Sequence, residues 1–385
     1  MVDLRPRLAP LLIGLLLTGC VASGNVQDIQ PGERPDLETD EAGLWMKMDR
    51  AEADMRSSGK VVRDPQLQAY LEGIVCDLAP DYCQDIRVYL VRNPGFNASM
   101  SPNGAMVVWT GLLLRCENEA QLAFVLGHEL AHYIQRHSLK RWRDLRATTS
   151  GMAFFQFATA ITGFGLVGDL ATLGALGGVM AFSRDHEREA DRIGLRLAQG
   201  AGYSGAEAAK IWDYLQREKD AADDGDGFIF FASHPPSDER RDTLAELATA
   251  TAGKGRRGAE AFRRLTAGHR LAWLRDELRL RDYARMEVLT AHLLESGDAP
   301  GAVHFLRGEL HRLRGEEGDD GKAVAAYYAA LKTRQAPAET YRSLGLVLWS
   351  MEKPREAQSA FRHYLRRRPK ADDRAMVEDY INQLN

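Results

Sequence analysis

The chain has 385 residues, of which 45% are hydrophobic and 27% are charged. This composition is typical of a globular protein of two or three domains and excludes collagen-like, mucin-like and wholly disordered chains. The net charge of −4 is too small to indicate nucleic acid as a partner. Residues 254–385 contain 25 Lys and Arg against 19 Asp and Glu, a balance of +6, which leaves −10 for residues 1–253. The opposite net charges of these two regions indicate two modules.

The first residues predict a lipoprotein signal peptide. Two arginines precede an apolar stretch over residues 8–17, about half of the roughly 20 residues that span a bilayer. The stretch ends in Leu-Thr-Gly-Cys, which resembles a bacterial lipobox; the alternative is a plain secretion signal with a coincidental cysteine. We expect a signal peptide over 1–19, lipid on Cys20, and a flexible tether over 20–40. Val21 is typical of lipoproteins sent to the outer membrane, so we predict a periplasmic, outer-membrane-anchored protein.

Three cysteines remain in the mature chain. The periplasm is oxidising and permits disulfides. Cys76 and Cys83 lie seven residues apart at the end of a predicted helix, and we expect them to be bonded. Cys116 would then be a buried free thiol, and nothing in the sequence places a base beside it.

The following elements alternate between helical and extended patterns. Residues 65–78 have helical spacing, and residues 86–91 alternate as a strand does. Residues 96–100 and 105–109 flank Ser-Pro-Asn-Gly, which predicts a hairpin. Helical periods follow from residue 117 to about 134 and again over 184–199 and 200–220. We therefore predict a mainly α domain with a small β-sheet over residues 41–253.

The region from 254 to 385 is predicted to be helical throughout. Its last part resembles tetratricopeptide repeats, because the 34-residue period places Ala323, Tyr327 and Ala330 in register with Ala357, Phe361 and Tyr364. We expect a C-terminal α-solenoid with two clear repeats, whose concave surface would hold another polypeptide.

The strongest motif in the chain is His128-Glu129-Leu130-Ala131-His132. Histidines four residues apart lie on one helical face, so His128 and His132 can bind one metal ion. Glu129 lies on the adjoining flank, where it can reach a metal-bound water as a general base. His137 is five residues further along, and on a continuous helix it would point away, as an ordinary surface histidine.

A catalytic zinc usually has three protein ligands. Glu187 and Asp191 are also four residues apart on a predicted helix. One of them can bind the metal while the other accepts a hydrogen bond from a ligand imidazole.

Together, the His-Glu-x-x-His motif and Ser183-Arg-x-x-Glu187-x-Glu-Ala-Asp191 resemble the zinc metallopeptidases that include HtpX and the CAAX prenyl protease. The resemblance implies a zincin-like domain with one Zn²⁺ per chain. It also implies that Glu187 is the third ligand and that Asp191 orients a ligand. His234, in Ser-His-Pro-Pro, would occupy the fourth position and keep the enzyme latent.

The expected chemistry is peptide hydrolysis, in which Glu129 takes a proton from water and delivers it to the leaving nitrogen. The resemblance further suggests that the strand around Asn97 and Ala98 pairs with substrate; the alternative is a purely structural hairpin.

An apolar run covers residues 152–182. Two membrane spans would need about 40 residues, and this run has 31, so complete crossing is unfavourable. The remaining alternatives are a helical hairpin packed near the active site and one that dips into the membrane surface.

The leading interpretation is a lipid-anchored zinc endopeptidase that degrades misfolded or stalled envelope proteins, with the outer-membrane protein assembly machinery as a further partner. From the resemblance, its clients would be outer-membrane β-barrel proteins. The alternative is a chaperone or assembly scaffold with a latent protease site. A complete general base favours the enzyme, because binding alone does not need one.

Overall fold

The computed structural model describes residues 26–148, 182–222, 229–234, 238–249, 254–297 and 299–384. Cys20 and residues 152–181 of the apolar run lie outside these ranges. Among the described residues, no helix combines the length and apolar character needed to cross a membrane.

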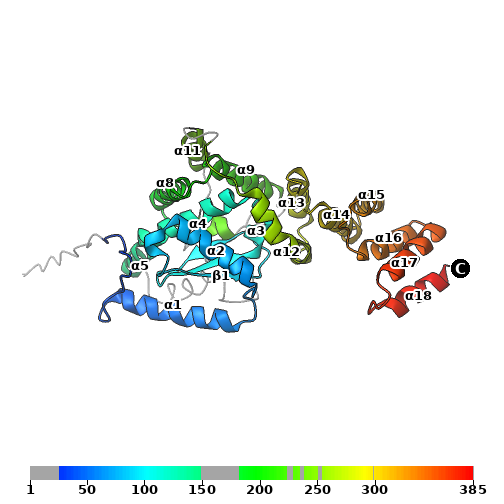
Figure 1. The fold of residues 1–385 in the computed structure, drawn as a ribbon, viewed down its shortest axis with the longest axis horizontal. Coiled ribbons are helices and arrows are strands. Elements are labelled where there is room, and N and C mark those ends of the chain that lie inside the picture. Colours follow the sequence, from blue (N-terminus) through cyan, green and yellow to red (C-terminus); the bar gives the residue numbers. More distant parts are fainter. Residues whose placement is uncertain are drawn as a thin grey trace, which may run out of the picture.

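The N-terminal part of the fold combines helices with one small sheet (Figure 1). Its elements, in chain order, are α1 (Asp40–Ser57), α2 (Pro65–Leu78), η1 (Pro80–Tyr82), β1 (Arg87–Val91), β2 (Ala98–Met100), β3 (Ala105–Trp109), α3 (Thr110–Arg115), α4 (Glu119–Ile134), α5 (His137–Thr148), α8 (Arg184–Gly200), α9 (Ala206–Ala221), α10 (Ile229–Ser233) and α11 (Asp238–Thr249).

Local capping explains where the principal helices begin. Asp64 accepts hydrogen bonds from two backbone N–H groups of the first turn of α2, and Pro65 occupies the first helical position. The Asn118 side chain accepts a hydrogen bond from the backbone N–H of Gln121 and caps α4. The Ser183 side chain accepts one from the backbone N–H of His186 and caps α8. The predicted boundaries of these three helices therefore agree closely with those observed, whereas α9 begins at Ala206, six residues after the start of the helix predicted over 200–220.

The described sheet has the strand order β1-β3-β2, with β1 parallel and β2 antiparallel to β3. Side chains alternate across it as the strand period requires. Val107 and Trp109 pack against Met55 of α1 on one face of the sheet. Met106 and Val108 join the main core on the other face, beneath α2 and α4. Figure 1 shows α1 below the sheet, with α2 and α4 above it.

Two cysteines are joined where α2 meets η1. Cys76 and Cys83 form a disulfide, and Cys116 is buried with a free thiol. Burial raises the pKa of this thiol far above its usual value, so Cys116 is a poor nucleophile.

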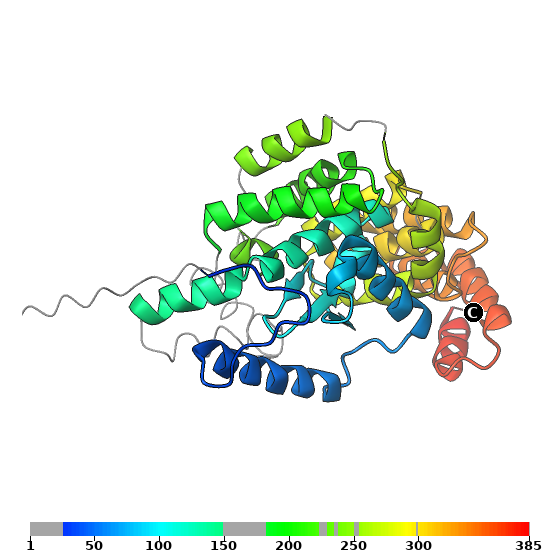
Figure 2. The ribbon, with the colours of Figure 1, turned by 60° about the vertical axis from the view of Figure 1, so that its left-hand side comes forward.

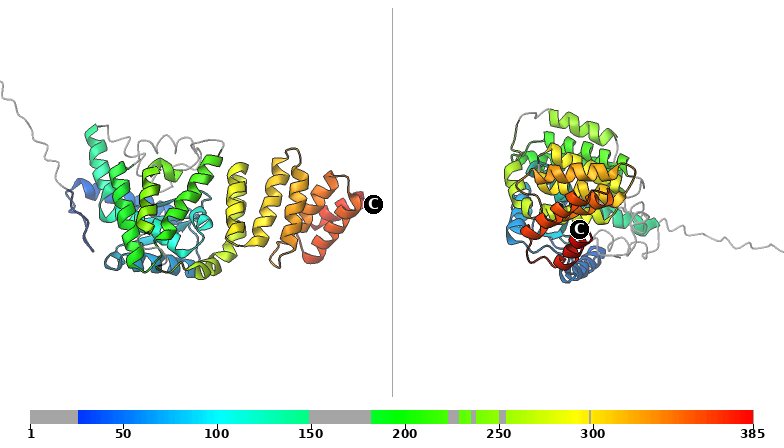
Figure 3. Two further views of the ribbon diagram at one scale, coloured as in Figure 1. Left: turned by 90° about the horizontal axis from the view of Figure 1, so that it is seen from above. Right: turned by 90° about the vertical axis from the view of Figure 1, so that its right-hand side faces the viewer.

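The C-terminal part is a row of helices that extends away from the body (Figure 3). They are α12 (Ala259–Arg279), α13 (Tyr283–Glu295), α14 (Pro300–Arg314), α15 (Asp319–Leu331), α16 (Glu339–Ser350), α17 (Pro354–Arg367) and α18 (Arg374–Gln383).

Neighbouring tail helices pack through a small residue against an aromatic ring. A Cβ placed on Gly308 would lie 2.3 Å from the ring of Tyr327, and one on Gly345 would lie 2.6 Å from that of Phe361. Both rings are fully buried. The helical character of the tail is as expected, and its assignment to tetratricopeptide repeats stays a prediction.

The hydrophobic core is continuous between the body and the beginning of the tail. In Figure 2 the first helices of the tail lie against the body. Helix α12 packs against α3 and α4, and α13 packs against α9. Residues 259–295 are therefore anchored on the body, and the domain boundary at residue 254 stays a prediction.

Candidate metal centre

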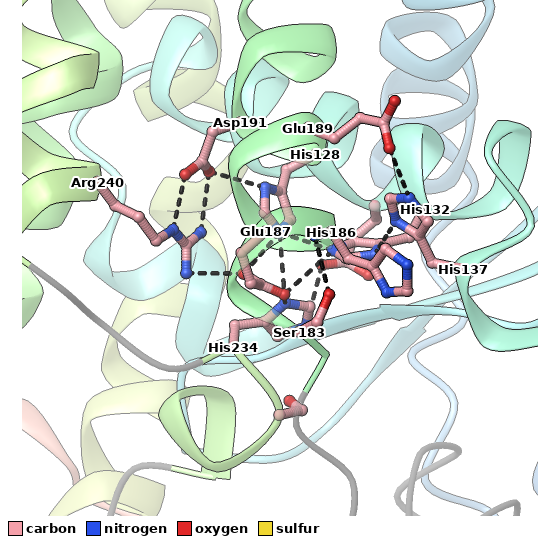
Figure 4. Close-up of polar contacts among 12 residues, drawn as sticks. His128, His132, His137, Ser183, His186, Glu187, Glu189, Asp191, His234 and Arg240 are labelled. Atoms are coloured by element: carbon pink, nitrogen blue, oxygen red, sulfur yellow. Dashed lines mark hydrogen bonds and ion pairs between the residues drawn. The ribbon is translucent and has the colours of Figure 1, made fainter. Parts of the chain in front are cut away.

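Helix α4 presents the His-Glu-x-x-His residues to the interior. His128, Glu129 and His132 are each only 2% exposed. The Nε2 atoms of His128 and His132 lie 3.0 Å apart, so the two imidazoles point at one place as their spacing predicts (Figure 4).

A close crossing of two helices brings α8 to this place. At the crossing, Gly127 of α4 faces Gly194 of α8, and a Cβ on Gly194 would lie 2.6 Å from the backbone nitrogen of His128. Only glycine permits this approach. It places Glu187, about two turns earlier on α8, with Oε2 3.6 Å from His128 Nε2 and Oε1 3.5 Å from His132 Nε2.

His234 reaches the same point from the end of α10. Its Nδ1 atom is 3.1 Å from Glu187 Oε1 and 3.3 Å from His128 Nε2. Its ring stacks on Phe230, with the centroids 4.6 Å apart. The structure thus brings together all four residues that the sequence proposed as ligands.

These four side chains fit a tetrahedral zinc ion. Their donor atoms all lie within 4.8 Å of one another and are buried. Zn–N bonds of 2.0–2.1 Å imply donor separations of about 3.3 Å, and the pairs described above are spaced close to this value. Glu129 Oε1 is buried, receives no hydrogen bond from the described residues, and lies 3.5 Å from His234 Nε2. A buried carboxylate oxygen left open beside a donor cluster is what a general base requires.

Asp191 and Arg240 contact this cluster from one side, through His128 and Glu187 (Figure 4). Asp191 Oδ1 lies 3.0 Å from His128 Nδ1, which leaves Nε2 free to bind a metal. Arg240 contacts both Asp191 oxygens, at 2.7 and 2.9 Å, and Glu187 Oε2 at 2.7 Å. Sequence reasoning missed Arg240, because an arginine in a polar helix gives no signal of its own.

The carboxylates of the site differ in their pKa values. Burial raises the pKa of Glu129, although the charges of His234 and His128 oppose the shift. Burial acts in the same direction on Asp191, but the hydrogen bond that it accepts from Arg240 prevails and lowers the pKa of Asp191 to about 2. The pKa of Glu187 is also lowered, since the charge of His234 and the hydrogen bond between the two outweigh burial. Asp191 and Glu187 are therefore anionic, as supports and ligands of a cation must be.

The prediction that His137 lies on the surface is wrong. His137 is 0% exposed, and its Nδ1 atom lies 2.9 Å from Nδ1 of His132. The prediction assumed a continuous helix, but α4 ends at Ile134 and the chain turns through Arg136, whose φ is 52°. This left-handed turn starts α5 at His137 and directs its side chain back toward His132.

The predicted substrate strand lies at an edge of the described sheet. Asn97 directly precedes β2, Ala98 begins it, and both are buried. Asn97 Oδ1 finds no hydrogen-bond donor within the described ranges. A backbone hydrogen bond from Met100 acts on the Glu129 carboxylate, so β2 borders Glu129 directly.

The fold and this donor set define a metallopeptidase domain. Residues 62–248, just under half of the chain, match the model of peptidase family M48.

Curated relatives carry protease names. The chain is 32% identical over 218 residues to a protein of Yersinia pestis named beta-barrel assembly-enhancing protease, covering 51% of this chain and 44% of that protein. The protein of that name from Escherichia coli is 29% identical over 160 residues, covering 39% of this chain and 32% of the relative. Mitochondrial metalloendopeptidase OMA1 of Schizosaccharomyces pombe is 35% identical over 155 residues, covering 40% and 44%. The matches thus span less than half the length of each relative.

Proposed function

We propose that this protein is a zinc-dependent endopeptidase of the cell envelope. The observation that carries the proposal is the convergence of His128, His132 and Glu187 beside Glu129, whose Oε1 atom receives no hydrogen bond from the described residues, within an M48 domain. Zinc bound by these side chains would act as a Lewis acid that lowers the pKa of a coordinated water to about 7.

Glu129 performs the proton transfers. Its carboxylate is enclosed by the sheet edge and by His234, and burial raises its pKa, so it holds a proton more readily than an exposed glutamate. It takes the proton of the attacking water and delivers it to the nitrogen of the cleaved peptide bond. The substrate backbone is held in extended form along β2, next to this carboxylate.

His234 keeps the enzyme latent. Its Nδ1 atom lies within 3.3 Å of two proposed metal-ligand atoms, His128 Nε2 on α4 and Glu187 Oε1 on α8. Its Nε2 atom lies beside Glu129. A side chain in this position occupies the place that a substrate carbonyl would take. Catalysis therefore requires His234 to move away.

One observation supports the proposed envelope location, and another supports the proposed clients. The lipobox ending at Cys20 supports a lipid anchor, and the name of the Yersinia and Escherichia relatives supports a role beside β-barrel assembly. The proposed clients are misfolded or stalled outer-membrane β-barrel proteins, recruited by the helical tail.

Casein cleavage by the zinc-loaded full-length mature protein tests the proposal. Glu129→Gln should lower the rate by roughly 10²–10⁴-fold, because it removes the general base. It should leave zinc binding intact, since Glu129 is not a ligand. His234→Ala should raise the rate. Undiminished cleavage by Glu129→Gln would contradict the proposed mechanism.

The alternative is a chaperone or assembly scaffold whose protease site stays latent. The contacts of His234 favour it, because they describe a blocked centre. It predicts that the wild type and both variants bind zinc and leave casein intact.

A further inference from the structure

The two histidines of α4 are oriented in different ways. His128 has a direct carboxylate partner, since its Nδ1 atom lies 3.0 Å from Asp191. The corresponding atom of His132 faces another histidine, His137 Nδ1, at 2.9 Å. On its far side, His137 Nε2 lies 3.2 Å from Oε2 of Glu189. The side chains of His132, His137 and Glu189 thus form a series of hydrogen bonds, which leads from the metal centre toward the surface of α8 (Figure 4).

Hydrogen bonding fixes where the protons of this chain reside. If His132 binds a metal through Nε2, its Nδ1 atom carries the proton and is a donor. His137 Nδ1 must then accept, so its own proton lies on Nε2. That N–H faces Glu189 Oε2, which is an acceptor. Every group in the chain therefore has a suitable partner in one arrangement of protons.

The backbone holds His137 in this position. The left-handed residue Arg136 starts the turn, and its guanidinium pairs with Glu41 at 2.8 Å and with Glu33 at 3.0 Å. The ring of His137 stacks on that of His186, with the centroids 4.2 Å apart. A side chain clamped by its turn, its stack and its hydrogen bonds is rigid enough to orient another ring.

We propose that His137 is a positioning residue, which fixes the tautomer and ring orientation of His132 and is itself anchored by Glu189. The inference rests on the metal-binding part of the proposed function and does not depend on proteolysis. Partners of this kind are worth 10–100-fold in metal affinity when a carboxylate or carbonyl supplies them.

Zinc affinity of the full-length mature protein, measured by competition with a chromophoric chelator, tests the proposal. His137→Leu preserves bulk but removes the acceptor, so its Kd for zinc should rise about 10–100-fold. His137→Asn places a carbonyl oxygen near the position of Nδ1 and should restore affinity to within about threefold of the wild type. The matched control is His363→Leu, which changes an exposed tail histidine and should leave the Kd unchanged.

A second readout separates positioning from mere packing. Cobalt substituted for zinc reports ligand geometry through its visible absorption bands, which should change in His137→Leu and return in His137→Asn. Wild-type zinc affinity and cobalt spectrum in a folded His137→Leu variant would overturn the proposal. So would His137→Asn behaving like His137→Leu, since packing alone would then explain both.

The outcomes also distinguish this inference from the function on which it rests. A wild type that binds zinc but never cleaves casein would count against the endopeptidase and leave the His137 comparison valid. A wild type that binds no zinc would overturn both.

Discussion

The metal centre and the helical tail both bury polar side chains, but they satisfy them differently. In the tail, donors meet acceptors directly: Arg314 pairs with Asp319 at 2.8 Å, and the Tyr327 hydroxyl donates to Glu309 at 2.6 Å. In the metal centre, the Nε2 atoms of His128 and His132 face each other at 3.0 Å. When each imidazole holds its proton on Nδ1, both Nε2 lone pairs point at one place, where a metal ion would bind them together. These tail pairs are therefore satisfied within the protein, whereas the donor atoms of the centre are arranged to hold a metal ion.

The two regions also use glycine differently. Gly194 permits one backbone to approach another, whereas Gly345 permits an aromatic ring to approach a helix. A ring can shift by a few tenths of an ångström, but two packed helices move only as units. Errors in packing should consequently affect the centre more than the tail.

The largest effect is expected where the two regions join. Arg115 of α3 is fully buried and pairs with Glu218 of α9 and, at 2.6 Å, with Glu277 of α12. Arg115→Ala leaves two buried carboxylates without this partner and should lower the free energy of unfolding by about 3–5 kcal/mol. Urea denaturation measures the loss.

The control for this prediction is Arg374→Ala. Arg374 forms an exposed i,i+4 pair with Glu378, and its removal should cost about 0.5 kcal/mol or less. Equal effects of the two substitutions would show that the buried cluster does not hold the body and tail together.

A smaller effect on stability, but a specific one on function, is expected from Gly194→Ala. The added Cβ presses on the backbone of His128, which should cost about 1–3 kcal/mol of stability. A displacement of Glu187 by about 1 Å would lower casein cleavage on the order of 10²-fold. Gly345→Ala is the matched variant, and it should weaken the tail while zinc affinity stays unchanged. If both variants kept full zinc affinity, the helix crossing would not be what positions Glu187.

The smallest effect concerns the tail at acidic pH. The hydrogen bond from Arg314 lowers the pKa of Asp319 below its ordinary value. Its contribution to stability is therefore present above the unfolded pKa of about 4, and is lost as the pH falls toward the lower pKa of the folded state. Asp319→Asn should destabilise the protein at pH 7, and the difference from wild type should narrow below about pH 4. Parallel stability curves for the two proteins from pH 7 to pH 3 would argue against this role.

Much of the fold could be predicted because its signals are local. The apolar period and the Asn118 cap define α4, and the spacing of His128 and His132 places them on one face of it. The hairpin turn likewise identifies β2 and β3. Glu187 was a candidate from its own helix, but its assignment as a ligand needed a family resemblance, because spacing alone also allowed Asp191.

The tertiary structure decided what depends on two segments meeting. The helices α4 and α8 cross at Gly127 and Gly194, and this crossing sets how closely Glu187 approaches the histidines. The sequence around these two glycines does not predict the crossing. His137 was misassigned because one residue with positive φ, Arg136, reverses the direction that a continuous helix would give it. Helix periodicity is encoded by neighbours in the chain, so the sequence by itself predicted that His128 and His132 share one helical face, with Glu129 on the adjoining flank. The orienting role of Asp191 was expected from the family resemblance. Arg240 and His137 reach the centre from another helix and another turn, so only the tertiary structure could place them there.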